Sequence, residues 1–107
     1  SKFNFSFTGV APLASTDYSL IVYREPWSTP SSPVGWPRPV IVLGSDTSDG
    51  AGNVAIPDTS TELGTNLLNT KIWLVKTGDL AVDTISGWNP ADYLFDTGLI
   101  DYYDADL

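Results

Sequence analysis

The chain opens with a strict alternation of hydrophobic and polar positions. Over residues 2–8, the apolar side chains of Phe3, Phe5 and Phe7 alternate with Lys, Asn, Ser and Thr. An alternation with a period of two is typical of a β-strand that buries one face. We therefore expect a half-buried strand whose inner face is aromatic.

A second apolar run follows at Tyr18–Arg24, after an arch that contains Val10, Pro12 and Leu13. Both faces of this run are mostly apolar, which predicts a central strand that is covered on each side. The arch and Tyr18 fit the tyrosine-corner device, in which the ring is buried and its hydroxyl bonds back to the arch. We expect Tyr18 to anchor a corner between two packed sheets.

Short apolar runs and turn signals alternate along the rest of the chain. Asp49 and Gly50 lie at the centre of the polar segment Ser45–Asn53, which predicts a hairpin turn. Residues 58–70 predict a loop or a single helical turn. Further strands are expected at Pro39–Gly44, Asn53–Pro57, Lys71–Lys76, Tyr93–Phe95 and Leu99–Tyr103.

The segment between the strands expected at Lys71–Lys76 and Tyr93–Phe95 is predicted to be a connection followed by a short helical turn. Residues 78–87 predict a long connection. Asn89 and Pro90 then occupy the places of an N-cap and a first helical residue, so one short helical turn is expected over residues 88–93.

These runs amount to about seven strands, with turn signals at the spacing of a β-sandwich. Nine glycines and eight prolines in 107 residues favour strands joined by turns, and the aromatic residues are numerous enough for a core. The predicted fold is all-β, a single-domain Greek-key β-sandwich over residues 1–107.

Charge and composition exclude several classes of function. Five basic residues against thirteen acidic ones give a net charge of −8, which argues against nucleic acid or an anionic membrane as a partner. The chain contains no cysteine and no histidine, so disulfides, thiolate or imidazole metal sites and Ser-His-Asp catalysis are excluded. No apolar run approaches the length of a membrane-spanning helix, and we expect no membrane insertion.

Two phrases in the second half of the chain are distinctive: Lys-Ile-Trp-Leu-Val at Lys71–Val75 and Gly-Trp-Asn-Pro at Gly87–Pro90. Together with Asp17–Tyr23 and Pro26-Trp27, they make the chain resemble uncharacterised exported β-sandwich modules of archaea and bacteria. The resemblance implies export and a sandwich fold and brings no known activity. The chain begins directly on a strand, as expected of a mature or excised domain at the cell surface or outside the cell.

The corner motif also resembles that of fibronectin type III domains, where it precedes a late strand. Here it precedes the second strand at Tyr18, because only residues 2–8 form a strand before it. The expected topology is therefore immunoglobulin- or fibronectin-like without being the standard one.

The segment 25–39 holds five of the eight prolines and two tryptophans, Trp27 and Trp36. Proline has no N–H for a β-ladder, so we expect an extended loop. Its tryptophans, flanked by Arg38, could form a platform for a sugar or a peptide, because flat rings offer a large contact area. Alternatively, they form a small core for the loop itself. The same two interpretations apply to Trp88 and Tyr93, whereas Trp73 is expected in the core.

The acidic turn is a candidate calcium site. Asp46, Asp49 and Asn53, with Asp58 as a further candidate, could supply the oxygen ligands that Ca²⁺ prefers. The alternative is an ordinary turn, which uses the same residue types. A second acidic cluster near the end of the chain is expected to be a solvated surface, because strand alternation separates its members. Its members are Asp101, Asp104 and Asp106.

Two further hypotheses concern the first strand. Asn4-Phe5-Ser6 is a glycosylation sequon, with Asn4 on the polar face. The apolar face, formed by Phe3, Phe5 and Phe7, could pair within its own domain or insert into a neighbouring copy as a donated strand.

No carboxylate pair is marked by its context as an acid–base pair, and we predict that the chain is not an enzyme. The favoured function is that of a non-enzymatic extracellular structural, adhesive or assembly module, with protein partners or self-assembly. The alternative is a carbohydrate-binding module that uses the tryptophans of the proline-rich loop. No cofactor is expected, apart from calcium as the candidate described above.

Overall fold

The computed structural model describes residues 3–24, 36–61, 63–81, 84–95 and 100–102. This part of the chain forms ten strands and two short turns of 3-10 helix. They are β1 (Phe3–Val10), β2 (Asp17–Tyr23), β3 (Arg38–Pro39), β4 (Ile41–Thr47), β5 (Asn53–Thr61), β6 (Leu67–Lys76), η1 (Thr77–Asp79), β7 (Leu80–Ala81), β8 (Thr84–Ile85), η2 (Pro90–Asp92), β9 (Leu94–Phe95) and β10 (Ile100–Tyr102).

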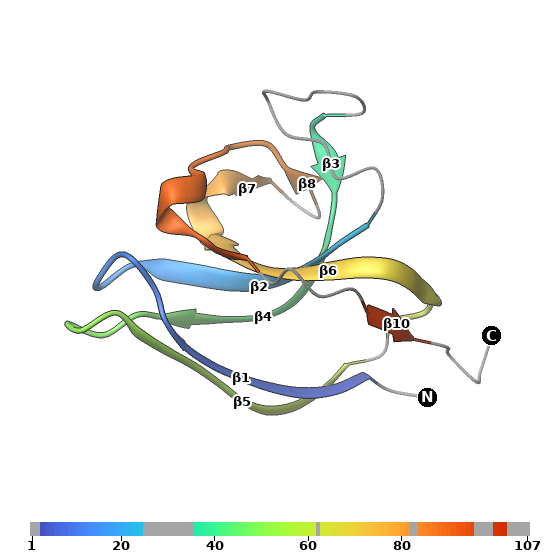
Figure 1. Ribbon diagram of the computed structural model, residues 1–107, viewed down its shortest axis with the longest axis horizontal. Coiled ribbons are helices and arrows are strands. Elements are labelled where there is room, and N and C mark those ends of the chain that lie inside the picture. The colour runs from blue at the N-terminus through green and yellow to red at the C-terminus, as the bar shows by residue number, and fades with distance from the viewer. Residues whose placement is uncertain (1–2, 25–35, 62, 82–83, 96–99, 103–107) are drawn as a thin grey trace.

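The strands are stacked in three layers (Figure 1). The middle layer has the order β10-β6-β2-β4, with β9 also paired to β6. The antiparallel pair β1-β5 covers one face of it, and the small sheet β3-β8-β7 covers the other. The prediction of an all-β sandwich is confirmed, with a third, smaller layer that the sequence pattern did not indicate.

The middle strand β2 divides its side chains between two cores. Tyr18, Leu20 and Val22 lie in the core beneath β1 and β5, and Ile21 and Tyr23 lie in the core beneath the small sheet. All five are at most 3 % exposed. The prediction of a central strand with two covered faces is therefore confirmed, and its cause is the alternation of apolar residues on both faces.

The outer pair β1-β5 is antiparallel and runs from the partners Phe3 and Thr61 to Val10 and Asn53. The side chains of β1 alternate between half-buried and exposed along its whole length, as the period of two predicts. The register shifts between Phe5 and Phe7, so Ser6 lies at a β-bulge. The predicted half-buried aromatic strand is confirmed.

The hairpin predicted at Ser45–Asn53 is wrong. β4 continues to Thr47 and pairs with β2, whereas β5 begins at Asn53 and pairs with β1. The turn between them therefore crosses from one layer to another. An Asp-Gly turn specifies a reversal of the chain, and the burial of apolar residues on both strands decides which partner each strand takes.

The loop predicted for residues 58–70 is also largely wrong. β5 extends through Thr61 and β6 begins at Leu67, so most of this polar segment belongs to strands. Leu67 and Thr70 are buried while Leu68 and Asn69 are exposed, and Asn69 has a φ of +52°. The irregular backbone at Asn69 breaks the simple alternation by which the strand could have been recognised.

The long connection predicted over residues 78–87 contains η1 and the two-residue strands β7 and β8, which pair with each other. The helical turn expected near residue 90 is confirmed as η2. Asn89 stands at its N-cap position, but its side chain does not bond to the turn. Neither helical segment in the described residues is long or apolar enough to cross a membrane.

Candidate functional site

Aromatic rings gather on the face of the middle sheet that carries the small sheet. Trp73, on β6, stacks on Tyr23 with 4.3 Å between ring centroids and an interplanar angle of 25°. Trp88 lies edge-on to Trp36 at 5.6 Å and to Tyr93 at 5.5 Å. Three of the residues predicted to bind a ligand are thus brought into one cluster, which we call the aromatic cluster. It comprises Tyr23, Trp36, Trp73, Trp88, Tyr93 and Phe95.

The aromatic cluster runs from the core to the surface. Trp73 and Tyr93 are 6 % and 4 % exposed, Trp36 and Trp88 are half-buried, and Phe95 is 42 % exposed. The core position predicted for Trp73 is observed. Because Trp36 and Trp88 meet at an angle of 78°, they form an angular surface and not one flat platform.

The other two predicted residues are Arg38 and Trp27. Arg38 lies on β3 and is half-buried, and its charge acts on the hydroxyl of Tyr23. Burial raises the pKa of Tyr23 to about 12, and the nearby Arg38 charge opposes part of that rise. Trp27 lies outside the described residues.

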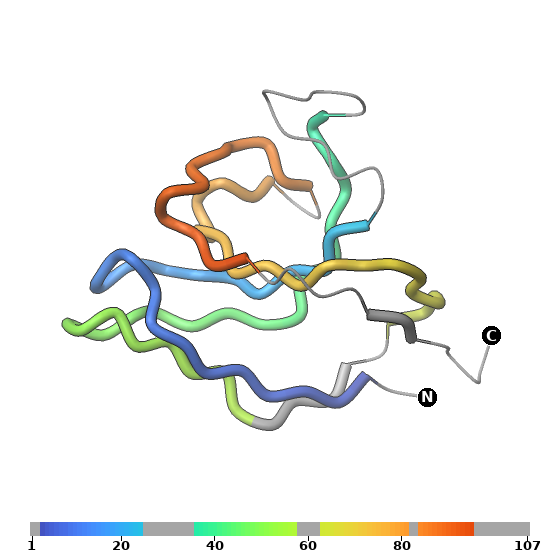
Figure 2. The backbone as a smooth tube through the Cα atoms, in the orientation of Figure 1, coloured from blue at the N-terminus to red at the C-terminus, as the bar shows by residue number. Residues whose placement is uncertain are grey.

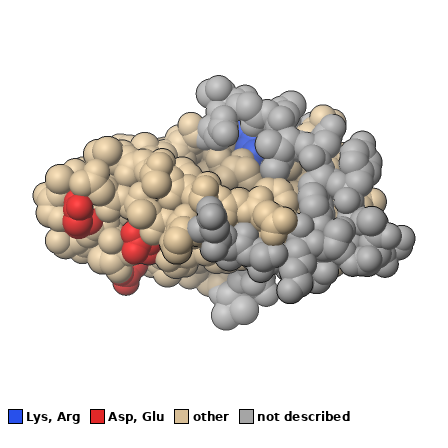
Figure 3. All heavy atoms as spheres, turned by 90° about the horizontal axis from the view of Figure 1, so that it is seen from below, with Lys and Arg blue, Asp and Glu red and all other residues tan. Residues whose placement is uncertain are grey.

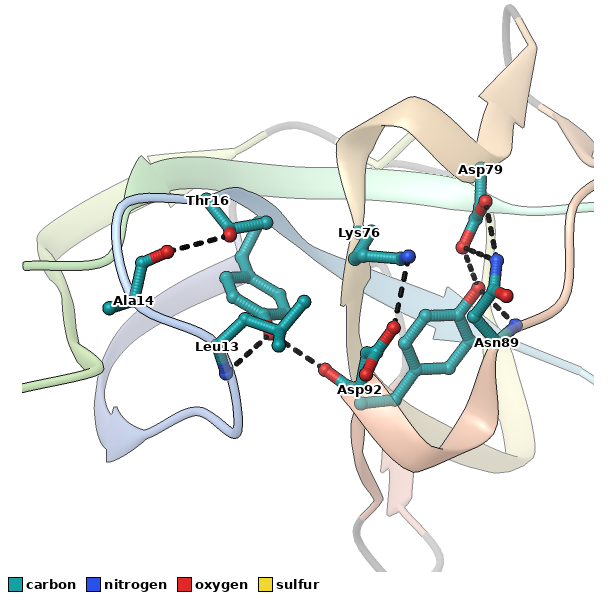
Figure 4. Close-up of polar contacts among 9 residues, drawn as sticks. Leu13, Ala14, Thr16, Lys76, Asp79, Asn89 and Asp92 are labelled. Atoms are coloured by element: carbon teal, nitrogen blue, oxygen red, sulfur yellow. Dashed lines mark hydrogen bonds and ion pairs between the residues drawn. The ribbon is translucent and has the colours of Figure 1, made fainter.

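The Asp79 carboxylate is hydrogen-bonded to two residues of the loop that carries Trp88 (Figure 4). Asp79 accepts hydrogen bonds from the hydroxyl of Tyr93 and from the side-chain amide of Asn89, the latter at 3.0 and 3.1 Å to its two carboxylate oxygens. The Tyr93 hydroxyl in turn accepts the backbone N–H of Asn89 at 3.0 Å. Burial, followed by the bond to Asp79, raises the pKa of Tyr93 well above its ordinary value.

The Gly-Trp-Asn-Pro phrase has a structural explanation in this loop. The backbone carbonyl of Asp79 accepts the N–H groups of Ser86 and Gly87 at 3.0 and 2.9 Å. A Cβ atom on Gly87 would lie 2.5 Å from an oxygen of the Asp79 carboxylate, so only glycine allows this approach. Sequence reasoning missed Asp79, because nothing in its local context marks it as the partner of residues seven and more positions away.

The tyrosine corner is confirmed, and it reaches further than predicted. The Tyr18 hydroxyl accepts the backbone N–H of Leu13 at 3.3 Å, which is the bond to the preceding arch. It also donates to the backbone carbonyl of Asp92 in η2 at 2.7 Å. The Asp92 carboxylate lies 3.0 Å from the Lys76 ammonium group and raises the pKa of Lys76. Tyr18 therefore joins the arch to the loop that carries Trp88 (Figure 4).

The candidate calcium ligands are hydrogen-bonded to the turn itself. One oxygen of Asp49 accepts the N–H groups of Ala51 and Asn53 at 2.9 Å each, and the other accepts the Asn53 amide at 3.0 Å. These bonds, led by the Asn53 side chain, lower the pKa of Asp49. Asp46 accepts the N–H of Ala55 on β5 at 2.9 Å. Asp49 thus serves the turn, which is the alternative that the sequence left open, whereas Asp46 joins β4 to β5. Calcium binding stays a prediction.

Among the described residues, no group of three or more acidic side chains is arranged to hold a metal ion. The remaining acidic candidates have no described side chains. Asp104 and Asp106 lie beyond the described residues, and the side chains of Asp58 and Asp101 are not described.

The first-strand candidates lie where the alternation placed them. Asn4 is exposed on the outer face of β1. Phe3, Phe5 and Phe7 face inward and pack against the core between the layers. Next to them lies a hollow of about 170 Å³, also lined by Leu20, Leu43 and Ile72 from the middle sheet.

Comparison with protein-family models found no match, and comparisons with curated proteins and with solved structures found no significant similarity. The resemblance to exported sandwich modules therefore remains a prediction from the sequence motifs.

Proposed function

We propose that this chain is a non-enzymatic structural module of an extracellular assembly, and that β1 is the strand through which neighbouring copies join. The observation that carries the proposal is the position of β1. It lies in an outer layer, is paired to β5 alone among the described strands, and inserts three phenylalanines toward the middle sheet. A strand held in this way can be supplied by another chain with the same contacts.

Part of the aromatic face of β1 is reached from the surface. Phe3, Phe5 and Phe7 are half-buried, and an open hollow of about 170 Å³ lies beside them. Because the hydrophobic effect scales with the apolar area removed from water, these side chains hold β1 to the middle sheet less tightly than fully buried phenylalanines would.

The described part of the outer surface of the β1-β5 pair would let two acidic chains approach each other. The exposed side chains described on residues 4–10 of β1 and 53–57 of β5 are uncharged, although the chain carries a net charge of −8. Figure 3 shows the molecule from this side, and the acidic side chains that it colours among the described residues lie toward the left end. The uncharged exposed residues are Asn4, Ser6, Thr8 and Val10 on β1 and Asn53, Ala55 and Pro57 on β5.

The proposal is tested by supplying β1 in trans. We expect the chain without residues 1–10 to melt at a much lower temperature than the full chain, because three inward phenylalanines are lost. A synthetic peptide of residues 1–10 should restore the melting temperature in a saturable way. A peptide with Phe5→Ser should fail, and one with Thr8→Ser, a change on the exposed face, should succeed. No rescue by the unmodified peptide would contradict the proposal.

A second function is favoured by the exposed end of the aromatic cluster. Trp36, Trp88 and Phe95 are in ring contact, and Phe95 is 42 % exposed. Aromatic surfaces of this kind bind sugar rings or peptides. Under this alternative the chain is a carbohydrate-binding module. Trp27, the other predicted tryptophan contact, lies outside the described residues.

A panel of soluble polysaccharides distinguishes the two functions. A carbohydrate-binding module should show saturable quenching of tryptophan fluorescence by one glycan, and Trp36→Ala should abolish it while the fold is retained. Under the structural proposal, no member of the panel changes the emission.

A further inference from the structure

Two connections between layers are fastened together at one end of the molecule. The arch 11–16 leads from β1 to β2, and the turn 48–52 leads from β4 to β5. The two lie side by side at the left of Figure 2. The N–H of Ala11 donates to the carbonyl of Gly52 at 2.8 Å, and that of Ser15 donates to the carbonyl of Asp49 at 3.3 Å.

Ser48 is the centre of this junction. It is 3 % exposed, and its hydroxyl donates to the carbonyl of Leu13 at 2.8 Å and accepts the N–H of Thr16 at 3.0 Å. Its own N–H donates to the carbonyl of Thr16 at 2.9 Å. One buried side chain therefore satisfies polar groups in the middle of the arch, at Leu13, and at its end, at Thr16. Leaving these buried groups without partners would destabilise the fold.

Gly52 permits the close approach of the two connections. Its φ is +86°, and a Cβ atom there would lie 2.5 Å from the carbonyl oxygen of Ala11. The nearest atom is backbone, so a side chain at this position could be accommodated only if the arch moved away. Gly50, in the same turn, has open space around it.

We infer that the junction of arch 11–16 with turn 48–52 is a latch that keeps β1 in its own domain and that its release lets β1 pair with β5 of a second copy. The inference rests on the proposed function. β1 can leave its own β5 only if the arch straightens, and the bonds of Ser48 and Gly52 hold the arch bent. A second copy is the occupant because it repeats every contact of the closed monomer, and the exposed side chains described at residues 4–10 and 53–57 of the β1-β5 pair are uncharged.

An introduced disulfide distinguishes β1 paired with β5 of its own chain from β1 paired with β5 of a second copy. Thr8 and Ala55 are opposite each other in the β1-β5 register and both are exposed. Directly opposed residues of an antiparallel pair lie at a separation that a disulfide can bridge. The chain has no cysteine, so Thr8→Cys with Ala55→Cys creates its only thiol pair. A closed monomer gives a bond within one chain, and an exchanged dimer gives bonds between chains on a non-reducing gel.

The full-length double-cysteine chain is incubated reduced at high concentration, diluted and then oxidised. We expect Ser48→Ala to raise the covalent-dimer fraction about tenfold, the effect of losing a net hydrogen bond from the closed form alone. Gly52→Ala should also raise it, because its Cβ would lie against the carbonyl oxygen of Ala11 in the closed form. Gly50→Ala, the control in the same turn, should leave the fraction unchanged. If either latch variant unfolds, the double-cysteine chain refolded from urea at high concentration is compared with the one refolded at low concentration.

Intrachain bonds in folded Ser48→Ala and Gly52→Ala chains, or an equal increase with Gly50→Ala, would overturn the latch. Intrachain bonds after refolding at every concentration would also overturn it. Rescue of the truncated chain by the peptide of residues 1–10, together with intrachain bonds here, would leave the proposed function standing and remove only the latch.

Discussion

Single residues explain the most distinctive sequence phrase of the chain. In Gly-Trp-Asn-Pro, Gly87 lets the backbone approach Asp79, Trp88 enters the aromatic cluster, Asn89 binds the Asp79 carboxylate and Pro90 starts η2. The loop that contains these four residues is therefore closed around the Asp79 carboxylate.

Replacing Gly87 tests this explanation. Gly87→Ala places a Cβ 2.5 Å from the Asp79 carboxylate and 3.0 Å from its Cα, so the loop must shift. We expect a loss of about 1–3 kcal/mol in the free energy of unfolding, as for other overpacked sites. Urea denaturation followed by tryptophan fluorescence measures it. Gly78→Ala is the matched control, because a Cβ at Gly78 has open space. Equal stability of the two variants would contradict the explanation.

The residues that sequence alone could identify here are those whose neighbours along the chain reveal their role. Tyr18 follows its own arch, and Pro90 begins its own turn, so both were predicted. Asp79 and Ser48 act on partners that the fold brings to them from other elements. Their local sequence contains ordinary turn residues, and no periodicity indicates such a partnership.

At the scale of elements, the tyrosine corner joins three parts of the chain. The Tyr18 side chain projects from β2, binds the arch at Leu13 and binds η2 at Asp92. The arch positions β1, and η2 carries the loop of the aromatic cluster. One hydroxyl thus connects the two regions for which functions are proposed.

Tyr18→Phe removes both bonds and leaves the N–H of Leu13 and the carbonyl of Asp92 without this partner. We expect a loss of about 1–3 kcal/mol in the free energy of unfolding, since a typical hydrogen bond contributes ~1 kcal/mol and a buried group without a partner adds to the loss. Chemical denaturation measures it, with Thr65→Ala at an exposed bond as the control. An unchanged denaturation midpoint for Tyr18→Phe would mean that neither bond stabilises the fold.

Elements were predicted best where burial follows a simple period. The alternation in β1 and the two apolar faces of β2 identified both strands and their layers. The pairing of β4 and β5 could not be derived, because the same turn residues join strands within a layer and between layers. The small sheet also escaped prediction, since a two-residue strand such as β7 has no detectable period.

The whole molecule is built on two cores that share the middle sheet. Leu20 and Leu74 face the core beneath β1 and β5, whereas Ile21 and Trp73 face the core beneath the small sheet. Because adjacent residues of the same two strands serve opposite cores, neither core can lose its packing without disturbing the other. We therefore treat the described fold as a single cooperative unit.

The burial of Tyr23 and Tyr93 in the core beneath the small sheet limits stability at alkaline pH. The folded pKa of Tyr23, about 12, and that of Tyr93 both exceed the ordinary value of 10.0. Above pH 10 the unfolded chain loses these protons first, so the free energy of unfolding falls as the pH rises toward the folded pKa values. Each tyrosine should contribute a decrease of up to about 1.4 kcal/mol per pH unit in that range.

A spectrophotometric titration of tyrosinate, with circular dichroism recorded in parallel, checks this expectation. Two tyrosines should ionise only as the fold is lost, and a urea-unfolded sample, in which tyrosines titrate near pH 10, is the control. Complete ionisation near pH 10 with the fold intact would contradict the burial of both hydroxyls.

The pairing of β1 with β5 has a consequence for the time course of synthesis. β1 is synthesised before its partner, which begins only at Asn53 and ends at Thr61. At translation rates of roughly 5–20 residues per second, β1 waits on the order of several seconds with its phenylalanines exposed. Nascent chains on neighbouring ribosomes would meet β1 during this interval, before turn 48–52 exists to restrain it.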